Sequence, residues 1–319
     1  MAADESFPTI ARRFEDFKIP STEENRRAYR DMLFTTPGLR RFISGVILFD
    51  ETMRQRTQRG EPMPEALARR GMVPGIKVDG GTAALAGFPG EKVTQGLDGL
   101  GDRLAEYRRL GARFTKWRAV LAIGRGMPTR ACVAANARMH ALFAALSQEA
   151  GLVPIVEPEV LMDGNHTIDR CEAVTTSVLE TVFDALSEHG VVLEHMLLKT
   201  GMVLSGGDCP APAGSAAVAE ATVRCLLRAV PAAVPGIVFL SGGQGDRDAT
   251  EHLNSICRRG PLPWTVSFSY GRALQAPALK AWRGSPARIA AAQAALRHRA
   301  CCNGLAARGK YSVRDERGR

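Results

Sequence analysis

Hydrophobic positions along the chain fall into short runs separated by longer amphipathic stretches. Within the runs, neighbouring residues are mostly Val, Ile, Leu or Phe, as in the buried strands of a parallel sheet. The stretches between them repeat apolar residues at the three-to-four-residue spacing of a helix that buries one face. We predict strands at 46–49, 75–78, 113–117, 153–156, 195–199, 236–240 and 265–268, and helices at 97–110, 130–150, 168–189, 216–230 and 249–258.

The alternation of strand and helix, with a period of roughly 30–40 residues, is typical of consecutive βα units. Residues 1–3, directly before Asp4, would supply an eighth strand with a shortened start. We therefore predict an α/β fold, a TIM (β/α)8 barrel with a truncated first strand. The alternative is an open, doubly wound sheet, but that fold would need a glycine-rich phosphate loop after its first strand, and the sequence has none there.

No low-complexity linker divides the chain, so we predict a single catalytic domain over residues 1–319. The last residues, from about 303 to 319, are rich in charges, and we expect them to form a loose C-terminal tail.

The first predicted strand is short, because a typical strand has about 5–6 residues. Its neighbours near Val46 and Val266 would be left with unpaired backbone groups, and Asp4 would lie on a frayed end. We therefore hypothesise that the natural protein begins upstream of Met1. The alternative is a genuine short form whose first strand is completed by solvent or by a neighbouring subunit.

Composition narrows the class of protein. No apolar run approaches the roughly 20 residues of a membrane-spanning helix, and no secretory signal precedes the acidic start. The 7 cysteines are scattered without a C-x-x-C pair, and none of the 6 histidines stands at metal-ligand spacing from another. We therefore expect a cytoplasmic protein with free thiols, no metal and no cofactor.

The net charge of +9 has two interpretations. It could attract an anionic partner such as a phosphorylated metabolite or a nucleic acid. It could also be an ordinary solvated, arginine-rich surface, since much of the excess lies in residues 297–319. We favour the second interpretation and expect no nucleic-acid partner, because no basic stripe is interleaved with aromatic residues.

Charged residues stand at the carboxyl ends of the predicted strands, which is the end of a barrel where active sites are built. Residues two apart share one face of a strand. Structural salt bridges could explain one such strand, but charges facing the helices would be costly to desolvate. The pattern therefore favours a polar cavity lined by Lys77 and Asp79, Lys116 and Arg118, Glu157 and Glu159, and Lys199.

Two glycine-containing loops follow the last two predicted strands. One is Ser241-Gly242-Gly243-Gln244, and the other is Ser269-Tyr270-Gly271-Arg272, which opens a helical stretch. Glycine lets backbone N–H groups approach an anion, a helix N-terminus favours negative charge, and arginine adds a charged fork. In barrels these two loops commonly bind phosphate, so together they predict a phosphate site.

Lysines, glutamates and a phosphate site without metal ligands suggest one kind of chemistry. A lysine amine close to a second cation, here Lys116, can be an uncharged nucleophile at neutral pH. Its attack on a ketone gives an iminium that accepts electrons during C–C cleavage or formation. Glutamates can transfer the protons.

Segments along nearly the whole chain resemble class I fructose-bisphosphate aldolases of the animal and plant type. The segments that carry this resemblance are 2–6 (AADES), 22–27 (TEENRR), 45–49 (GVILF), 75–79 (GIKVD), 94–100 (TQGLDGL), 116–118 (KWR), 155–159 (IVEPE), 197–199 (LLK), 239–244 (FLSGGQ) and 268–275 (FSYGRALQ). The resemblance implies reversible aldol cleavage of fructose 1,6-bisphosphate to dihydroxyacetone phosphate and glyceraldehyde 3-phosphate, in glycolysis and gluconeogenesis. It also implies a cytoplasmic homotetramer.

The resemblance implies a role for each matching residue. Lys199 is similar to the Schiff-base lysine that attacks the C2 ketone, and Glu157 to the general acid/base. Asp4 matches the aspartate that orients the C4 hydroxyl, and Lys116 and Glu159 complete the charge network. The implied C1-phosphate ligands are Ser241, Gly242, Gly243, Ser269, Gly271 and Arg272; Lys77, Ser6, Arg13 and Thr9 match the region of the C6 phosphate, and Arg118 and Arg26 are further cations associated with substrate.

The sequence departs from the family pattern at several places. Phe7-Pro8-Thr9 replaces the usual Thr-Gly-Ser, Thr200-Gly201 follows the lysine where animal members have Pro-Asn, and the chain lacks the long tail with a terminal tyrosine. Two alternatives therefore stay open beside the bisphosphate aldolase. One is a lysine aldolase of other sugar phosphates, and the other is a non-catalytic truncated paralogue or scaffold protein.

Overall fold

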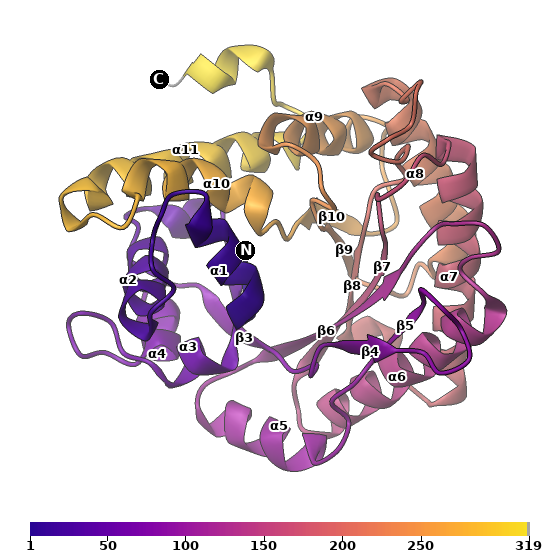
Figure 1. Cartoon of the computed structure of the whole chain (residues 1–319), viewed down its shortest axis with the longest axis horizontal. Coiled ribbons are helices and arrows are strands. Elements are labelled where there is room, and N and C mark those ends of the chain that lie inside the picture. Colours follow the sequence, from indigo (N-terminus) through magenta and orange to yellow (C-terminus); the bar gives the residue numbers. More distant parts are fainter. Residues whose placement is uncertain (318–319) are drawn as a thin grey trace.

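The computed structural model describes residues 1–317, and its centre is a sheet of parallel strands surrounded by helices (Figure 1). Spatial order in the sheet is β1-β2-β3-β6-β7-β8-β9-β10, so each βα unit adds the next strand on the same side. This confirms the predicted (β/α)8 barrel. The strands are β1 (Ala2–Ala3), β2 (Gly45–Leu48), β3 (Val73–Lys77), β6 (Phe114–Leu121), β7 (Val153–Val160), β8 (Leu197–Thr200), β9 (Gly236–Phe239) and β10 (Thr265–Phe268).

The helices form an outer layer around the strands (Figure 1). Three of them begin where the sequence provides a threonine cap: the hydroxyls of Thr22, Thr129 and Thr167 each accept a hydrogen bond from the backbone N–H three residues later. The helices are α1 (Phe7–Glu15), α2 (Glu23–Phe34), α3 (Asp50–Arg54), α4 (Met63–Arg69), α5 (Leu100–Arg109), α6 (Arg130–Glu149), α7 (Ile168–Glu188), α8 (Ser215–Ala229), α9 (Asp246–Cys257), α10 (Arg272–Trp282) and α11 (Ile289–Ala306).

A short antiparallel hairpin, β4 (Thr82–Ala84) with β5 (Lys92–Thr94), lies outside the barrel sheet. The sequence pattern did not predict this hairpin. It follows β3 and packs against β6 and α6. The amide oxygen of Asn136 on α6 accepts a hydrogen bond from Thr94 N–H, at 3.1 Å, and so attaches the hairpin to the barrel.

The registers between strands bring the charged strand ends to one edge of the sheet. Lys77 on β3 is level with Lys116 on β6, and Arg118 on β6 is level with Glu157 on β7. Because β6, β7 and β8 are direct neighbours, their charged side chains must share one mouth of the barrel.

The short first strand is buried and well anchored. Ala2 and Ala3 pair in parallel with Ile47 and Leu48 of β2. On the other side, Ala2 N–H donates to the carbonyl of Tyr270 at 3.0 Å, and the Gln275 amide donates to Ala2 O at 2.5 Å. The first strand is thus short, as expected, but the expectation that Asp4 would lie on a frayed end is wrong.

The C-terminal segment was expected to be a loose tail from about residue 303, and the structure differs up to Arg317. Asn303 and Ala306 are fully buried at the end of α11, and Tyr311 is 8% exposed. The short 3-10 helix η4 (Val313–Arg317) then places Glu316 in an ion pair with buried Arg299. Glu316 is thus held by an ion pair, whereas Arg308, Lys310 and Arg314 are exposed. Residues 318–319 lie outside the described part.

Among residues 1–317, no helix has both the length and the apolar composition needed to cross a bilayer.

Candidate active site

Lys199 lies near the carboxyl end of β8 and is almost fully buried, with 3% of its surface exposed. Its Nζ atom is 3.0 Å from Oε1 of Glu157, which projects from the neighbouring strand β7. A lysine ammonium and a carboxylate at this separation can exchange a proton directly. The predicted nucleophile and the predicted acid/base are therefore in contact.

Lys116 on β6 completes the buried network from the other side. Its Nζ atom is 2.7 Å from Oδ2 of Asp4 and 3.3 Å from Oε2 of Glu157. Burial alone would lower the pKa of Lys116, but the neighbouring carboxylates Asp4 and Glu157 outweigh it and raise that pKa well above its usual range. Lys116 is therefore a permanent cation between two carboxylates.

The two carboxylates respond in the opposite direction. Burial would raise the pKa of Asp4 and of Glu157, yet the charge of Lys116 and then that of Lys199 lower both pKa values. Both groups are thus ionised in the resting site. Glu157 is then an available proton acceptor next to the Lys199 amine, which is what a Schiff-base lysine needs before it can attack a carbonyl.

A second set of charges surrounds this network. Arg118 Nε is 2.5 Å from Oε2 of Glu159, and Lys77 Nζ is 2.5 Å from Oδ1 of Asp79. The other oxygen of Asp79 accepts the backbone N–H of Arg118 at 3.2 Å and so ties β3 to β6. Sequence reasoning noted Asp79 as a strand-end charge but gave it no role in the site; its position two residues after Lys77 was the signal.

The two glycine loops meet at the ends of β9 and β10. Gly242 and Gly243 have φ angles of 53° and 97°, a backbone conformation that favours glycine. Arg272 Nη2 donates to the carbonyl of Gly243 at 2.7 Å and thus joins the two loops. Beside them, Arg272 and Gly243 line part of a hollow of about 650 Å³. As predicted, these loops lie together.

Arg13 lies in a different place from the one expected. It was grouped with Lys77, but a β-carbon at Gly271 would stand 3.4 Å from Arg13 Nη2, so Arg13 lies beside the second glycine loop. Its guanidinium pairs with Glu5, which also binds buried Arg30 at 2.7 Å. The buried Glu5–Arg30 pair holds α1 against α2, and sequence reasoning gave neither residue a role.

Ser6 and Arg26 lie around the start of α1. The hydroxyls of Ser6 and Thr9 are 3.2 Å apart, in the segment that begins two residues after Asp4. Arg26 pairs with Glu51 at 2.5 Å and its guanidinium lies 4.7 Å from the centre of the Phe7 ring. The unusual Phe7 therefore has a packing partner, and Arg26 is held by α3 and α1.

Comparison with known proteins decides the family. The model of "Fructose-bisphosphate aldolase class-I" matches residues 1–319. The chain is 56% identical to a probable fructose-bisphosphate aldolase class 1 of Xanthomonas campestris, over 98% of this chain and 93% of that one. It is 50% identical to the cytosolic fructose-bisphosphate aldolase 4 of Arabidopsis thaliana, over 98% of this chain and 79% of that one.

The chain belongs to the class I fructose-bisphosphate aldolases.

A solved structure of the fructose-bisphosphate aldolase of Plasmodium falciparum, in complex with TRAP and a small molecule inhibitor, has the same fold. The TM-score is 0.97 at 50% identity, covering 98% of this chain and 90% of that one. The fold match confirms the predicted barrel. Membership of the aldolase family confirms the predicted class of enzyme, a lyase that acts on a sugar bisphosphate.

Proposed function

We propose that this aldolase cleaves fructose 1,6-bisphosphate through a Schiff base on Lys199. The observation that supports this most strongly is the 3.0 Å contact between Lys199 Nζ and Glu157 Oε1, inside a buried network with Lys116 and Asp4. Covalent catalysis by an amine needs an adjacent base that can take its proton, and Glu157 is that base.

The first steps use only these two groups. Glu157 takes a proton from the Lys199 ammonium, and the neutral amine attacks the C2 ketone to give a carbinolamine. The protonated Glu157 then returns the proton to the departing C2 hydroxyl, which leaves as water, and an iminium forms. Glu157 is a carboxylate again at the end of this sequence, so acid and base roles alternate on one side chain.

Cleavage of the C3–C4 bond follows from the iminium. The bonding electrons move into the iminium to form an enamine, while the C4 hydroxyl gives its proton to a carboxylate and becomes the aldehyde. Glu157 accepts this proton, and Asp4, fixed by Lys116 at 2.7 Å, orients the hydroxyl. Lys116 offsets the negative charge of both carboxylates through the reaction. After glyceraldehyde 3-phosphate leaves, the protonated Glu157 gives its proton to C3 of the enamine. Hydrolysis of the resulting iminium by water then releases dihydroxyacetone phosphate and restores the Lys199 amine.

The two phosphates are proposed to bind at opposite sides of this network. The C1 phosphate is held by backbone N–H groups and hydroxyls of the two glycine loops, and Arg13 and Arg272 supply charge. The C6 phosphate is held by Lys77 with the paired hydroxyls that follow Asp4. The C1 ligands are Ser241, Gly242, Gly243, Ser269, Gly271, Arg272 and Arg13; the C6 ligands are Lys77, Ser6 and Thr9.

Arg118, Glu159 and Arg26 are proposed to act at the rim. The contact of Arg118 with Glu159, at 2.5 Å, leaves part of the guanidinium exposed toward the barrel mouth. Arg26 is held by Glu51 and would contribute charge at a distance. From the family resemblance we also infer a cytoplasmic homotetramer that works in glycolysis and gluconeogenesis without metal or cofactor.

Borohydride trapping tests the proposal. The protein is incubated with dihydroxyacetone phosphate, the iminium is reduced, and the modified peptide is identified by mass spectrometry. We expect one adduct per chain, on Lys199. An adduct on Lys116 or Lys77 would overturn the assignment, and no adduct at all would favour the non-catalytic paralogue or scaffold.

Substrate preference separates the remaining alternative, a lysine aldolase of other sugar phosphates. Fructose 1-phosphate lacks the group that Lys77 is proposed to bind. We expect kcat/KM for fructose 1,6-bisphosphate to exceed that for fructose 1-phosphate by at least about tenfold, because one charge-assisted contact contributes about 1.5–3 kcal/mol. Equal values would contradict a C6-phosphate site.

A further inference from the structure

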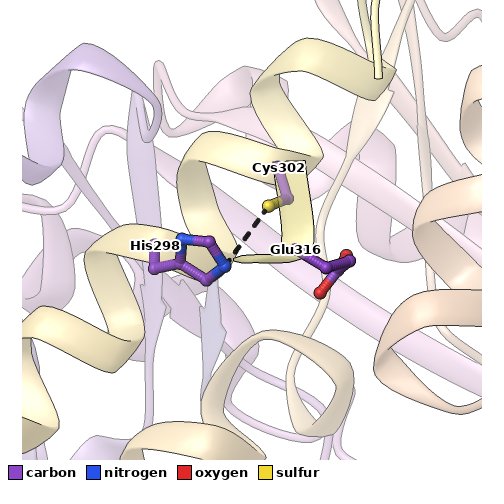
Figure 2. Close-up of side chains that lie close together, drawn as sticks. All are labelled: His298, Cys302 and Glu316. Carbon is purple, nitrogen blue, oxygen red and sulfur yellow. Dashed lines mark hydrogen bonds between the residues drawn. The ribbon is translucent and has the colours of Figure 1, made fainter. Parts of the chain in front are cut away.

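Helix α11 and the C-terminal helix η4 bring three side chains of a different kind together, at the outer face of the barrel. His298 and Cys302 lie one turn apart on α11, and Glu316 approaches from η4 (Figure 2). One ligand atom from each lies within 4.8 Å of the others. Within residues 1–317 this is the single group of three His, Cys, Asp or Glu side chains that meets this condition.

Sequence reasoning missed this group for two reasons. The metal-binding patterns considered were the spacing between two histidines and the C-x-x-C pair. The pair here is His298-x-x-x-Cys302, with one residue of each kind at i and i+4 of a helix. Residues at this spacing lie on the same face of a helix. Glu316 could not be connected to them, because the segment that carries it was expected to be loose.

The distance between the two helical ligands fits a tetrahedral metal. Cys302 Sγ and His298 Nε2 are 3.8 Å apart. Zinc lies about 2.3 Å from a cysteine sulfur and about 2.0–2.1 Å from a histidine nitrogen, so two such ligands at the tetrahedral angle are separated by about 3.6 Å. The pair therefore needs almost no rearrangement to hold one ion between its atoms.

The third candidate ligand is held in place by its own partners. Oε1 of Glu316 accepts the phenol O–H of Tyr311 at 2.7 Å, and the Arg299 guanidinium contacts both carboxylate oxygens, with Nη1 3.0 Å from Oε2. A carboxylate has about four lone-pair positions, and these bonds occupy three of them. A metal would take the fourth position, in place of the long 3.5 Å contact of Arg247 Nε with Oε2. Hydrogen bonds to a ligating carboxylate are usual around metal sites, because they fix its orientation.

Nearby positive charges limit the affinity of this group of side chains for a cation. Arg299 Nη1 lies 3.6 Å from Asp246 Oδ2, and Arg247 Nε lies 3.5 Å from Glu316 Oε2. The two arginines oppose a cation, while Glu316 and Asp246 favour it. Burial raises the pKa of the Cys302 thiol to about 11, so this thiol is uncharged until a metal displaces its proton. A site of this kind binds through soft and nitrogen ligands rather than through a large excess of negative charge, which selects zinc-like ions over Ca²⁺ or Mg²⁺.

We propose that His298, Cys302 and Glu316 form a structural binding site for Zn²⁺ or a chemically similar divalent ion. The Cys302 thiol loses its proton to solvent on binding, and water completes the fourth position. The bound ion links η4 to α11 and so fixes the C-terminal segment. The site shares no residue with the Lys199 network, so it does not take part in the aldol chemistry.

The simpler explanation is that Glu316 serves only as the counter-ion of buried Arg299, and that His298 and Cys302 are neighbours by helical repetition. The two explanations differ in what happens when metal is added. A counter-ion arrangement predicts no stoichiometric binding, whereas the proposed site predicts one ion per chain with a thiolate ligand.

Cobalt and zinc titrations of the full-length protein test the proposal. After treatment with EDTA and desalting, Co²⁺ is added while the thiolate-to-metal charge-transfer absorption is recorded. We expect one equivalent to produce this band and one equivalent of Zn²⁺ to abolish it. We also expect slower hydrogen exchange in residues 312–316 when Zn²⁺ is bound.

Two cysteine variants provide a matched pair, because Cys301 and Cys302 are adjacent on the same helix and only Cys302 faces His298. Cys302→Ser should lose the band and bind Zn²⁺ at least about 100-fold more weakly, since loss of an outer partner alone costs about 10–100-fold. Cys301→Ser should keep both, and His298→Ala should behave like Cys302→Ser. No band in the unmodified protein, or a band lost in Cys301→Ser but kept in Cys302→Ser, would overturn the proposal.

Discussion

Two buried clusters of charge in this aldolase have opposite organisation. The proposed catalytic network of Asp4, Lys116, Glu157 and Lys199 is carried by strands and by the residue that follows β1, and each carboxylate in it contacts a lysine amine. The C-terminal cluster is carried by a helix and a short terminal turn, and its main contact is the fork of Arg299 on Glu316. Lysine can lose its proton and react, whereas arginine stays charged. The first cluster is therefore suited to chemistry and the second to holding the chain together.

The largest expected effect is a loss of activity when the first cluster loses its reactive amine. Lys199→Met keeps the apolar stem and removes the amine, so no Schiff base can form and activity should fall by more than about 10⁴-fold. Steady-state kinetics with fructose 1,6-bisphosphate measure this. Lys92→Met, at an exposed lysine on β5, is the matched control and should retain activity. Substantial residual cleavage by Lys199→Met would mean that another amine is the nucleophile.

A change in the C-terminal cluster should have the opposite effect: it should lower the stability of the protein and leave its activity unchanged. Glu316→Gln removes the negative charge opposite Arg299, which is 2% exposed, and leaves Asp246 as its nearest acidic partner at 3.6 Å. Breaking a buried ion pair from one side costs about 3–5 kcal/mol, so the free energy of unfolding should fall by about that amount. Urea unfolding in EDTA measures it.

The control for this variant is Glu180→Gln at an exposed position of α7, which should leave the free energy of unfolding unchanged. The kcat of Glu316→Gln at a temperature where the protein is folded should match that of the parent. A large loss of kcat without loss of stability would contradict the division of roles between the clusters.

Arg272→Ala tests the phosphate loops next to the catalytic network. A charge-assisted contact contributes about 1.5–3 kcal/mol, so KM should rise roughly tenfold to a hundredfold. The kcat should change less, because no bond to the phosphate is made or broken in the reaction. Unchanged kinetics would mean that Arg272 serves only to join the loops through its bond to Gly243.

His140 offers a test of a buried group outside both clusters. It lies on α6, is fully buried, and neither ring nitrogen has a hydrogen-bond partner among residues 1–317. Burial lowers the pKa of His140 from 6.5 to about 4, against smaller opposing effects of Glu157 and Asp79. The folded protein therefore keeps this histidine neutral.

The sign of the pH dependence follows from proton counting. Between pH 6.5 and about 4 the unfolded chain binds a proton at His140 that the folded protein does not, so stability falls as the pH falls through this window. His140→Leu removes this loss, and relative to the parent it should gain about 2 kcal/mol between pH 7 and pH 5. Chemical unfolding at both pH values measures it, with exposed His195→Leu as control. An equal loss in parent and variant would show that His140 does not titrate in this way.

The smallest expected effect is that of EDTA, which should not change the catalytic activity. EDTA should leave kcat and KM for fructose 1,6-bisphosphate unchanged, because the proposed chemistry uses an amine and carboxylates only. The same treatment should remove metal from the C-terminal site. If activity were lost in EDTA and restored by Zn²⁺, a metal would take part in catalysis. That result would contradict a mechanism that uses only the network around Lys199.

Much of the barrel, and the contacts within the proposed catalytic network, could be predicted from the sequence, because both depend on local pattern. A period of two along each strand places Lys116 and Arg118 on one face, and parallel order brings all carboxyl ends to one edge. The contact of Lys199 with Glu157 follows from those two facts once β7 and β8 are neighbours.

What could not be predicted depends on packing between distant segments. The family resemblance grouped Arg13 with Lys77, but the direction in which α1 leaves Asp4 puts it beside Gly271. The position of residues 303–317 depends on Arg299 and Asn303 being buried, and a charge-rich composition alone suggests the opposite. His298 and Glu316 meet only because that segment folds back.

The closure of the barrel has a consequence for how activity is acquired during folding. Residues 2 and 270 join the two edges of the sheet through one backbone hydrogen bond, helped by the side chain of Gln275. Contacts between residues so distant in sequence form late, since a long loop must close first. Asp4 lies directly after this closing contact, so we expect enzyme activity to return in the slowest refolding phase. Hydrogen exchange of the Ala2 amide should report the opening of the same contact.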